Sequence, residues 1–330
     1  MSLNLRFIPI SHSWAAIHPK PKGVIQFIAG AFFGTFGPMF FYRHLLKFLY
    51  EQGYTIILLP FNFTFNHYVE SIFLIREQYN ILPELIRIAS QRNYHYEVYL
   101  DDKNFSWVGH SLGCKYIALL EGFSALPDSP DERKTFIQDL LKGSRSEKQI
   151  DQVVEQIESL IQDLEQKIDT MRQQVDQYVH QQVQINSVFI KGQESILLAP
   201  AITGTEAAIR PQWLAGFVDR LGLGVIPTPD ETFNLIHKSG LFNLTGLVRF
   251  KSDDIAAETC DRFVNQLSKP PQDFRLALLG KHLRPLGIQL SHFVLNLENP
   301  IIESVERRNS TVENLVFQLF QALKKFKRNH

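Results

Sequence analysis

Short apolar runs alternate with longer amphipathic stretches through the first half of the chain. The runs at 24–29, 55–60 and 105–109 are almost continuously apolar, which is typical of strands buried on both faces. The stretches at 40–52 and 67–90 repeat their apolar residues with the helical period. This strand–helix–strand–helix order predicts an α/β fold, in which helices cover both faces of a mostly parallel sheet.

The same rhythm returns in the second half. Apolar runs at 195–201, 247–250 and 274–280 predict three further strands, and the tail from residue 303 predicts an amphipathic helix. The segment at about 203–246 has no clear strand, so we expect a small helical cap there.

Residues 128–186 interrupt the rhythm. Their apolar positions follow one another at alternating spacings of 4 and 3, which form a heptad seam. The seam residues are Ile150, Val154, Ile157, Ile161, Leu164, Ile168, Met171, Val175 and Tyr178. Because no Pro or Gly occurs from 147 to 184, we expect one long coiled-coil-like helix. The chain is then one core, made of residues 1–127 and 187–330, that carries a helical insertion at 128–186.

Composition narrows the functional class. The 34 Lys and Arg balance the 34 Asp and Glu, so the formal net charge is zero and nucleic acid is an unexpected partner. Two Cys, with no C-x-x-C pair, exclude a disulfide framework and a cysteine zinc site. We expect no metal and no cofactor. We also expect no transmembrane segment and a cytoplasmic or plastid stroma-like location, because no apolar run reaches the length of a membrane span.

The pentapeptide Gly109-His110-Ser111-Leu112-Gly113 fits the pattern G-x-S-x-G and lies between a predicted strand and a predicted helix. This is the setting of a nucleophile elbow, a sharp turn that lifts a serine hydroxyl above the sheet. A plain glycine turn that lets strand and helix pack closely is the alternative. The context favours Ser111 as a nucleophile.

Partners for such a serine follow in the order acid, then histidine. Asp253 and Asp254 come directly after one predicted strand, and His282 comes after the last. The carboxyl ends of parallel strands meet at one edge of the sheet, so these groups should converge with Ser111. The apolar Ile255 would tuck the turn beneath Asp253, but Asp254 would serve equally. The sequence leaves both aspartates open.

An oxyanion hole needs two N–H donors. One should be the amide of Leu112, which directly follows the serine. The loop after the first predicted strand, Gly30-Ala31-Phe32-Phe33-Gly34, should supply the other through Ala31 or Phe32.

With these motifs the chain resembles the α/β-hydrolase superfamily over residues 20–125 and 195–290. The resemblance implies an eight-stranded, mostly parallel sheet and hydrolysis of an ester, thioester or amide through Ser111, His282 and an aspartate. More narrowly, the chain resembles a family of α/β-hydrolase-like proteins without a settled activity, found in cyanobacteria and plastids. The segments that carry this resemblance are WAAIHPKPKGVIQFIAGAFFG, GHSLGCK, FKSDDIAAET and LLGKHLRP.

We therefore expect a serine hydrolase that acts on an ester- or thioester-linked acyl group. Aromatic residues near 31–42 and 60–68 suggest a lipid-like acyl substrate, although they would equally pack helices onto the sheet. The alternative is a non-catalytic scaffold with a hydrolase-like body. For the heptad helix at 147–184 three roles stay open: a homodimer interface, a docking arm for a partner protein, or a lid over Ser111.

Overall fold

The computed structural model describes residues 4–31, 33, 37–62, 64–143, 145–202, 225–298 and 301–329. Within these residues an eight-stranded sheet has the order β1-β2-β4-β3-β5-β6-β7-β8. Its strands are β1 (Ile8–Ile10), β2 (Ser13–Ala16), β3 (Val24–Ile28), β4 (Thr55–Leu58), β5 (Phe105–His110), β6 (Glu194–Leu198), β7 (Thr245–Phe250) and β8 (Arg275–Leu278).

The strands from β3 to β8 are parallel to one another, whereas β2 runs antiparallel to β4. The chain leaves β3 toward β4 and then returns to β5 on the other side of β3. This reversal is a topological switch point, where open α/β sheets form a crevice. With helices on both faces, the arrangement is that of the α/β hydrolases, so the predicted fold class is confirmed.

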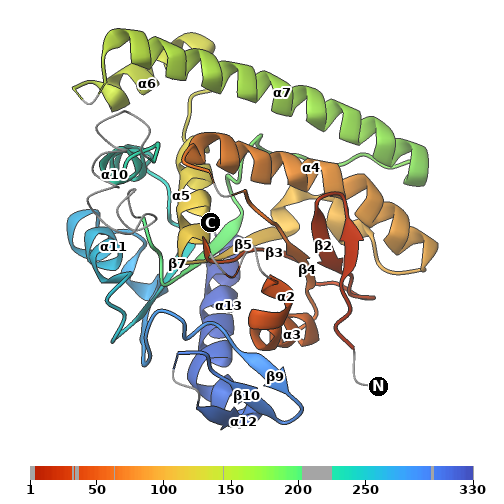
Figure 1. Cartoon of the computed structure of the whole chain (residues 1–330). Helices are drawn as coiled ribbons and strands as arrows, with labels where there is room; N and C mark the ends of the chain where they lie inside the picture. The colour runs from red at the N-terminus through yellow and green to blue at the C-terminus, as the bar shows by residue number, and fades with distance from the viewer. Residues whose placement is uncertain are drawn as a thin grey trace.

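Helices lie on both faces of the sheet (Figure 1). On one face are α4 (His67–Gln91), α5 (Leu112–Phe123) and α10 (Pro229–Lys238); on the other are α3 (Arg43–Glu51) and α13 (Asn314–Asn329). The shorter helices are α2 (Pro38–Phe41), α11 (Ala257–Asp261) and α12 (Val305–Arg308). The helix expected at 67–90 is therefore present almost unchanged.

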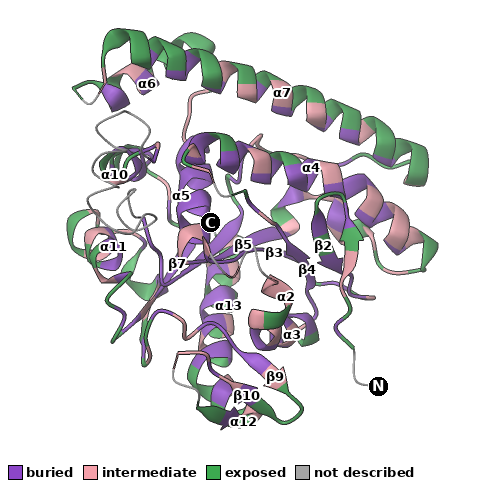
Figure 2. Ribbon diagram, in the orientation of Figure 1, coloured by how far each residue is buried: buried purple, intermediate pink, exposed green. Residues whose placement is uncertain are grey.

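The core lies in the central strands, which appear as buried ribbons in Figure 2. Every residue of β3, β4, β5 and β6 is buried. This agrees with their largely apolar sequences, because strands with helices on both faces have no solvent-facing side. The central strands were thus predictable from the sequence.

A second sheet of three short strands was not predicted. It consists of β9 (Ile288–Leu290), β10 (Phe293–Leu295) and β11 (Ile302–Ser304), in the order β11-β10-β9. Strands of three residues leave too short a pattern to separate from a loop.

The insertion contains α6 (Pro130–Leu141) and α7 (Glu147–Val179), which together we call the arm. The 33 residues of α7 form one uninterrupted helix, as expected. At its start the Ser146 N–H donates to the Gln149 side chain at 3.0 Å, and it ends at His180, whose φ is 52°.

The seam of α7 is covered by the same chain. Figure 1 shows α7 along the outer side of α4, away from the sheet. All seam residues are buried except Tyr178, which is 46% exposed. Arg76 of α4 also pairs with Asp163 of α7, at 3.1 Å. Because α4 receives the seam, those apolar residues are not the surface that a second chain would meet.

Of the expected cap at about 203–246, residues 203–224 lie outside the described residues. The remainder holds α10, which begins with a capping box at Thr228 and Glu231. Among the described helices, none combines the length and apolar character that crossing a membrane requires.

Candidate active site

Ser111 lies at the turn between β5 and α5, in a strained backbone conformation with φ 55° and ψ −118°. The flanking glycines are there for close contact. A Cβ at Gly113 would collide with the carbonyl groups of Ile28 and, at 2.8 Å, of Ala29. A Cβ at Gly109 would lie 2.9 Å from the Cys114 nitrogen. The G-x-S-x-G pattern is therefore a steric requirement of this turn, as a nucleophile elbow demands.

Ser111, His282 and Asp253 form one line of hydrogen bonds. The Ser111 Oγ lies 2.8 Å from the His282 Nε2. The His282 Nδ1 lies 3.0 and 3.1 Å from the two carboxylate oxygens of Asp253. Since a carboxylate accepts, Nδ1 carries the ring proton and Nε2 is free to accept from the serine hydroxyl. Three residues predicted from their order in the chain are thus in hydrogen-bond contact.

The structure distinguishes between the two aspartates. Asp253 is 5% exposed and faces His282, whereas Asp254 is exposed and does not belong to this line of hydrogen bonds. The expected role of Ile255 as an apolar support is wrong, because its side chain is 57% exposed. Its backbone matters instead: the Ile255 and Ala256 amides donate to the Asp253 Oδ1 at 2.9 and 3.0 Å.

Those contacts keep Asp253 ionised. Burial alone would raise its pKa, but the hydrogen bonds from His282 and from the Ala256 and Ile255 amides outweigh burial and hold the pKa below its ordinary value. A carboxylate in this position stabilises an imidazolium and fixes the tautomer of the histidine.

The loop after β3 approaches the serine closely. A Cβ at Gly30 would lie 3.2 Å from the Ser111 Cβ, so any side chain there would crowd the nucleophile. Ala31 follows in this loop, and Phe32 lies outside the described residues. Leu112 occupies the first position of α5, where a backbone N–H has no partner within its own helix. Ser111 therefore has backbone groups of both predicted oxyanion segments around it.

Two buried polar side chains near Ser111 were not predicted from the sequence. Tyr42 and His110 are 0% and 1% exposed, and their Oη and Nδ1 atoms lie 2.7 Å apart. Tyr42 lies within a predicted helix and His110 is the variable residue of G-x-S-x-G, so no sequence pattern marks either. Among the described residues, no group of three or more His, Cys, Asp or Glu side chains is placed to hold a metal ion.

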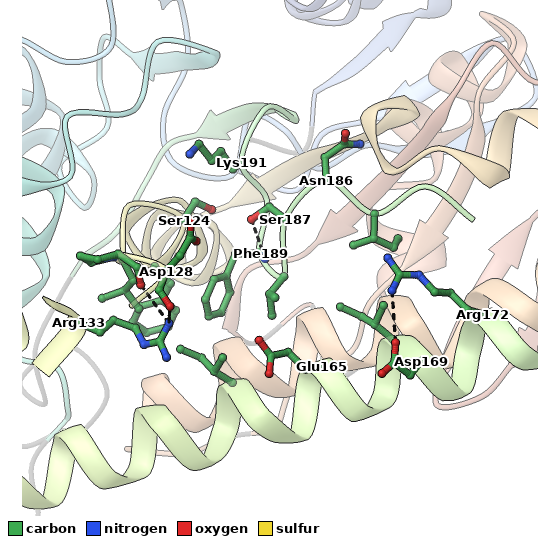
Figure 3. Close-up of a pocket in the computed structure, with 17 residues that line it drawn as sticks. Ser124, Asp128, Arg133, Glu165, Asp169, Arg172, Asn186, Ser187, Phe189 and Lys191 are labelled. Carbon is green, nitrogen blue, oxygen red and sulfur yellow. Dashed lines mark hydrogen bonds and ion pairs between the residues drawn. The ribbon is translucent and has the colours of Figure 1, made fainter. Parts of the chain in front are cut away.

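A pocket of about 580 Å³ lies between α7 and the segment 185–191, as Figure 3 shows. Phe123 and Ser124 line it from the C-terminal end of α5, whereas Ser111 is at the N-terminus of that helix. The 12 residues of α5 separate the two by ~18 Å, at ~1.5 Å per residue.

In the described structure α7 packs on the outer side of α4 and lines this pocket, at the end of α5 that is far from Ser111. It does not close over the serine, so the lid hypothesis is wrong.

Comparisons with known proteins give the following likenesses. A family model described as a protein of unknown function (DUF1350) matches residues 7–129. No curated protein matches the sequence.

Among solved structures, esterase B from Lactobacillus rhamnosis is 14% identical, with a TM-score of 0.46 over 96% of this chain and 82% of that chain. The carboxylesterase Cest-2923 from Lactobacillus plantarum WCFS1 is 11% identical, with a TM-score of 0.42 over 86% of each chain. An esterase from the Planctomycetes species Thermogutta terrifontis, Est2, is 11% identical, with a TM-score of 0.42 over 97% of this chain and 93% of that chain. The α/β-hydrolase fold of the present chain is defined by its own strand order.

Proposed function

We propose that this protein is a serine hydrolase that cleaves an ester- or thioester-linked acyl group through an acyl-enzyme. The observation that carries the proposal is the line Ser111–His282–Asp253, in which the serine lies within hydrogen-bond distance of a base and the base lies within hydrogen-bond distance of a carboxylate that orients it. The strained backbone of Ser111 supports it, because such strain persists where the surrounding structure enforces it and is found at functional sites.

In the first half-reaction the Ser111 Oγ attacks the acyl carbonyl carbon, and its proton passes to the His282 Nε2. Asp253 stabilises the imidazolium that results. The carbon–oxygen or carbon–sulfur bond to the leaving group then breaks, and His282 returns the proton to the departing alcohol or thiol. The acyl group stays on Ser111 as an ester.

In the second half-reaction a water molecule attacks this ester, while His282 takes the proton of the water. The Oγ–carbon bond breaks, the carboxylic acid leaves and the proton returns to Ser111. The negative charge on the carbonyl oxygen needs N–H donors in both steps. We assign one donor to the Leu112 amide and the other to the loop after β3, at Ala31 or Phe32.

An apolar acyl group is the substrate that we propose. Phe33, in the loop after β3, and Phe41, in α2, are half-buried and meet edge to face with ring centroids 4.9 Å apart. Half-buried aromatic side chains bind apolar groups and exclude water. The alternative of a scaffold that uses the seam of α7 gains no support, since α4 covers that seam.

The proposal is tested with p-nitrophenyl butyrate as ester and butyrylthiocholine as thioester. Wild-type protein should hydrolyse at least one of them, and Ser111→Ala and His282→Gln should each lower kcat by ~10⁴ or more. Folded wild-type protein that hydrolyses neither, or variants that retain the wild-type rate, would refute the proposal.

A further inference from the structure

A single chain of hydrogen bonds runs through the interior from the loop after β3 to the loop that carries His282. The Gly30 N–H donates to the Tyr42 Oη at 3.1 Å, and the Tyr42 Oη lies 2.7 Å from the His110 Nδ1. At the other end the His110 Nε2 lies 2.9 Å from the backbone carbonyl oxygen of His282. Residues from the loop after β3, from the start of α3, from the elbow and from the loop of His282 thus meet in one chain.

The direction of every hydrogen bond follows from its end groups. A carbonyl oxygen only accepts, so the His110 Nε2 carries a proton and donates to His282. Burial, with the nearby His282, lowers the pKa of His110 to about 3, so the ring is neutral and its Nδ1 is an acceptor. Tyr42 must therefore donate its hydroxyl proton to the Nδ1, while its oxygen accepts from Gly30. Burial raises the pKa of Tyr42, which keeps that proton in place.

The side chains of this hydrogen-bond chain are buried, and all of their polar atoms are hydrogen-bonded. Tyr42 and His110 are 0% and 1% exposed, and each of their polar atoms has a partner. Burying polar groups costs free energy unless every one is hydrogen-bonded, and a satisfied network fixes the relative position of the segments it joins. The two segments joined here are those on which the proposed reaction depends most for geometry.

We infer that Tyr42 and His110 are positioning residues, which hold the oxyanion loop and the loop of His282 at a fixed separation through this chain. The inference rests on the proposed function. The Gly30 amide donates to Tyr42, so the chain sets the direction in which the following Ala31 amide points. The His282 carbonyl is held by His110, so the imidazole enters the line to Ser111 from a fixed backbone.

Three variants probe the chain. Tyr42→Phe removes the hydroxyl and leaves the Gly30 N–H and the His110 Nδ1 without a partner. His110→Asn keeps a polar atom at the position of Nδ1 and loses the donor to His282. His110→Gln keeps a donor at the position of Nε2. The control is Tyr79→Phe, since Tyr79 is 1% exposed and its hydroxyl donates to the Val188 carbonyl at 2.9 Å, under the arm.

With p-nitrophenyl butyrate, Tyr42→Phe and His110→Asn should each lower kcat about 10-fold and change KM less than twofold, because one buried hydrogen bond is worth about that factor. His110→Gln should lose less than His110→Asn. Tyr79→Phe should lower the urea midpoint and leave kcat unchanged. If Tyr42→Phe behaves like Tyr79→Phe in kcat, the inference is wrong.

A second readout needs no activity, so that a failure of the proposed function stays distinguishable. The His282 ring gives ¹⁵N resonances that are assigned by their loss in His282→Gln. They should shift in Tyr42→Phe and stay in place in Tyr79→Phe. If wild-type protein does not hydrolyse esters and Tyr42→Phe leaves the resonances in place, both ideas fail. If wild-type protein does not hydrolyse esters but Tyr42→Phe shifts the resonances, the chain positions His282 and only the proposed function fails.

Discussion

The arm buries its seam residues, all but Tyr178, along one continuous helix, whereas the candidate active site joins single residues from distant segments. Ser111 and His282, in direct contact, are 171 residues apart in the chain, and His282 and Asp253 are 29 apart. The arm is held by apolar area, which tolerates small shifts, and the site by directed hydrogen bonds, which do not.

This difference predicts that substitutions in the two regions separate stability from activity. Removing apolar volume from the arm should destabilise the fold and leave the catalytic line intact. Removing a group from the line Ser111–His282–Asp253 should lower the rate by orders of magnitude and change stability much less. The following substitutions test that separation.

The largest effect is expected at the triad acid. Asp253→Asn should lower kcat by ~10⁴, because an amide leaves the His282 ring in the wrong tautomer. The neighbouring Asp254→Asn is the matched control and should stay within twofold, since its side chain is exposed. Steady-state hydrolysis of p-nitrophenyl butyrate measures both. Equal, mild losses in the two variants would mean that neither carboxylate acts as described.

A large effect on stability alone is expected in the arm. Leu164 is fully buried in the seam, so Leu164→Ala should lower the free energy of unfolding by about 2–5 kcal/mol. The adjacent Glu165 is exposed, and Glu165→Ala should change it by less than about 0.5 kcal/mol. Urea unfolding gives these values. A fall in kcat for folded Leu164→Ala would show that arm and site are coupled after all.

A smaller effect concerns acid stability and comes from a buried histidine of the core. His67 of α4 is 4% exposed; burial, with the charge of Lys115, lowers its pKa to about 3. Below its ordinary pKa of about 6.5, the unfolded chain binds a proton at His67 that the folded chain refuses. The contribution of His67 to stability therefore falls as the pH drops from about 6.5 toward 3, by about 1.4 kcal/mol per pH unit.

The measurement is the difference in unfolding free energy between wild type and His67→Gln at pH 7 and pH 5. Taking this difference removes the contributions of other titrating groups that both proteins share. One of them is Glu121: burial raises its pKa to about 7, and its contribution has the opposite sign. The unfolding free energy of His67→Gln minus that of wild type should be about 2 kcal/mol larger at pH 5 than at pH 7. An unchanged difference would contradict a neutral, buried His67.

Much of the molecule was predictable from the sequence, for physical reasons. Buried parallel strands are mostly apolar, and a nucleophile elbow needs Gly109 and Gly113 because any larger side chain collides. The order Ser111, aspartate, His282 follows from the fold. Adjacent aspartates in one turn differ only in direction, so the identity of the acid needed the coordinates of Asp253.

The partner of the seam was also not predictable from its period. Heptads specify which face of α7 is apolar and not what covers that face. A signal existed in α4, whose buried residues lie on more than one side of the helix, as expected of a helix covered on two sides. The chain through Tyr42 and His110 left no such signal, because it depends on contacts between distant segments.

The central claim is that Ser111 is a nucleophile activated by His282, and covalent labelling tests it most directly. Folded wild-type protein is incubated with a fluorophosphonate, digested and analysed by mass spectrometry. The account predicts a single adduct on the peptide that contains Ser111, absent in Ser111→Ala and formed at least about 10³-fold more slowly in His282→Gln. Folded wild-type protein that stays unlabelled, or an adduct that persists in Ser111→Ala, would contradict the account.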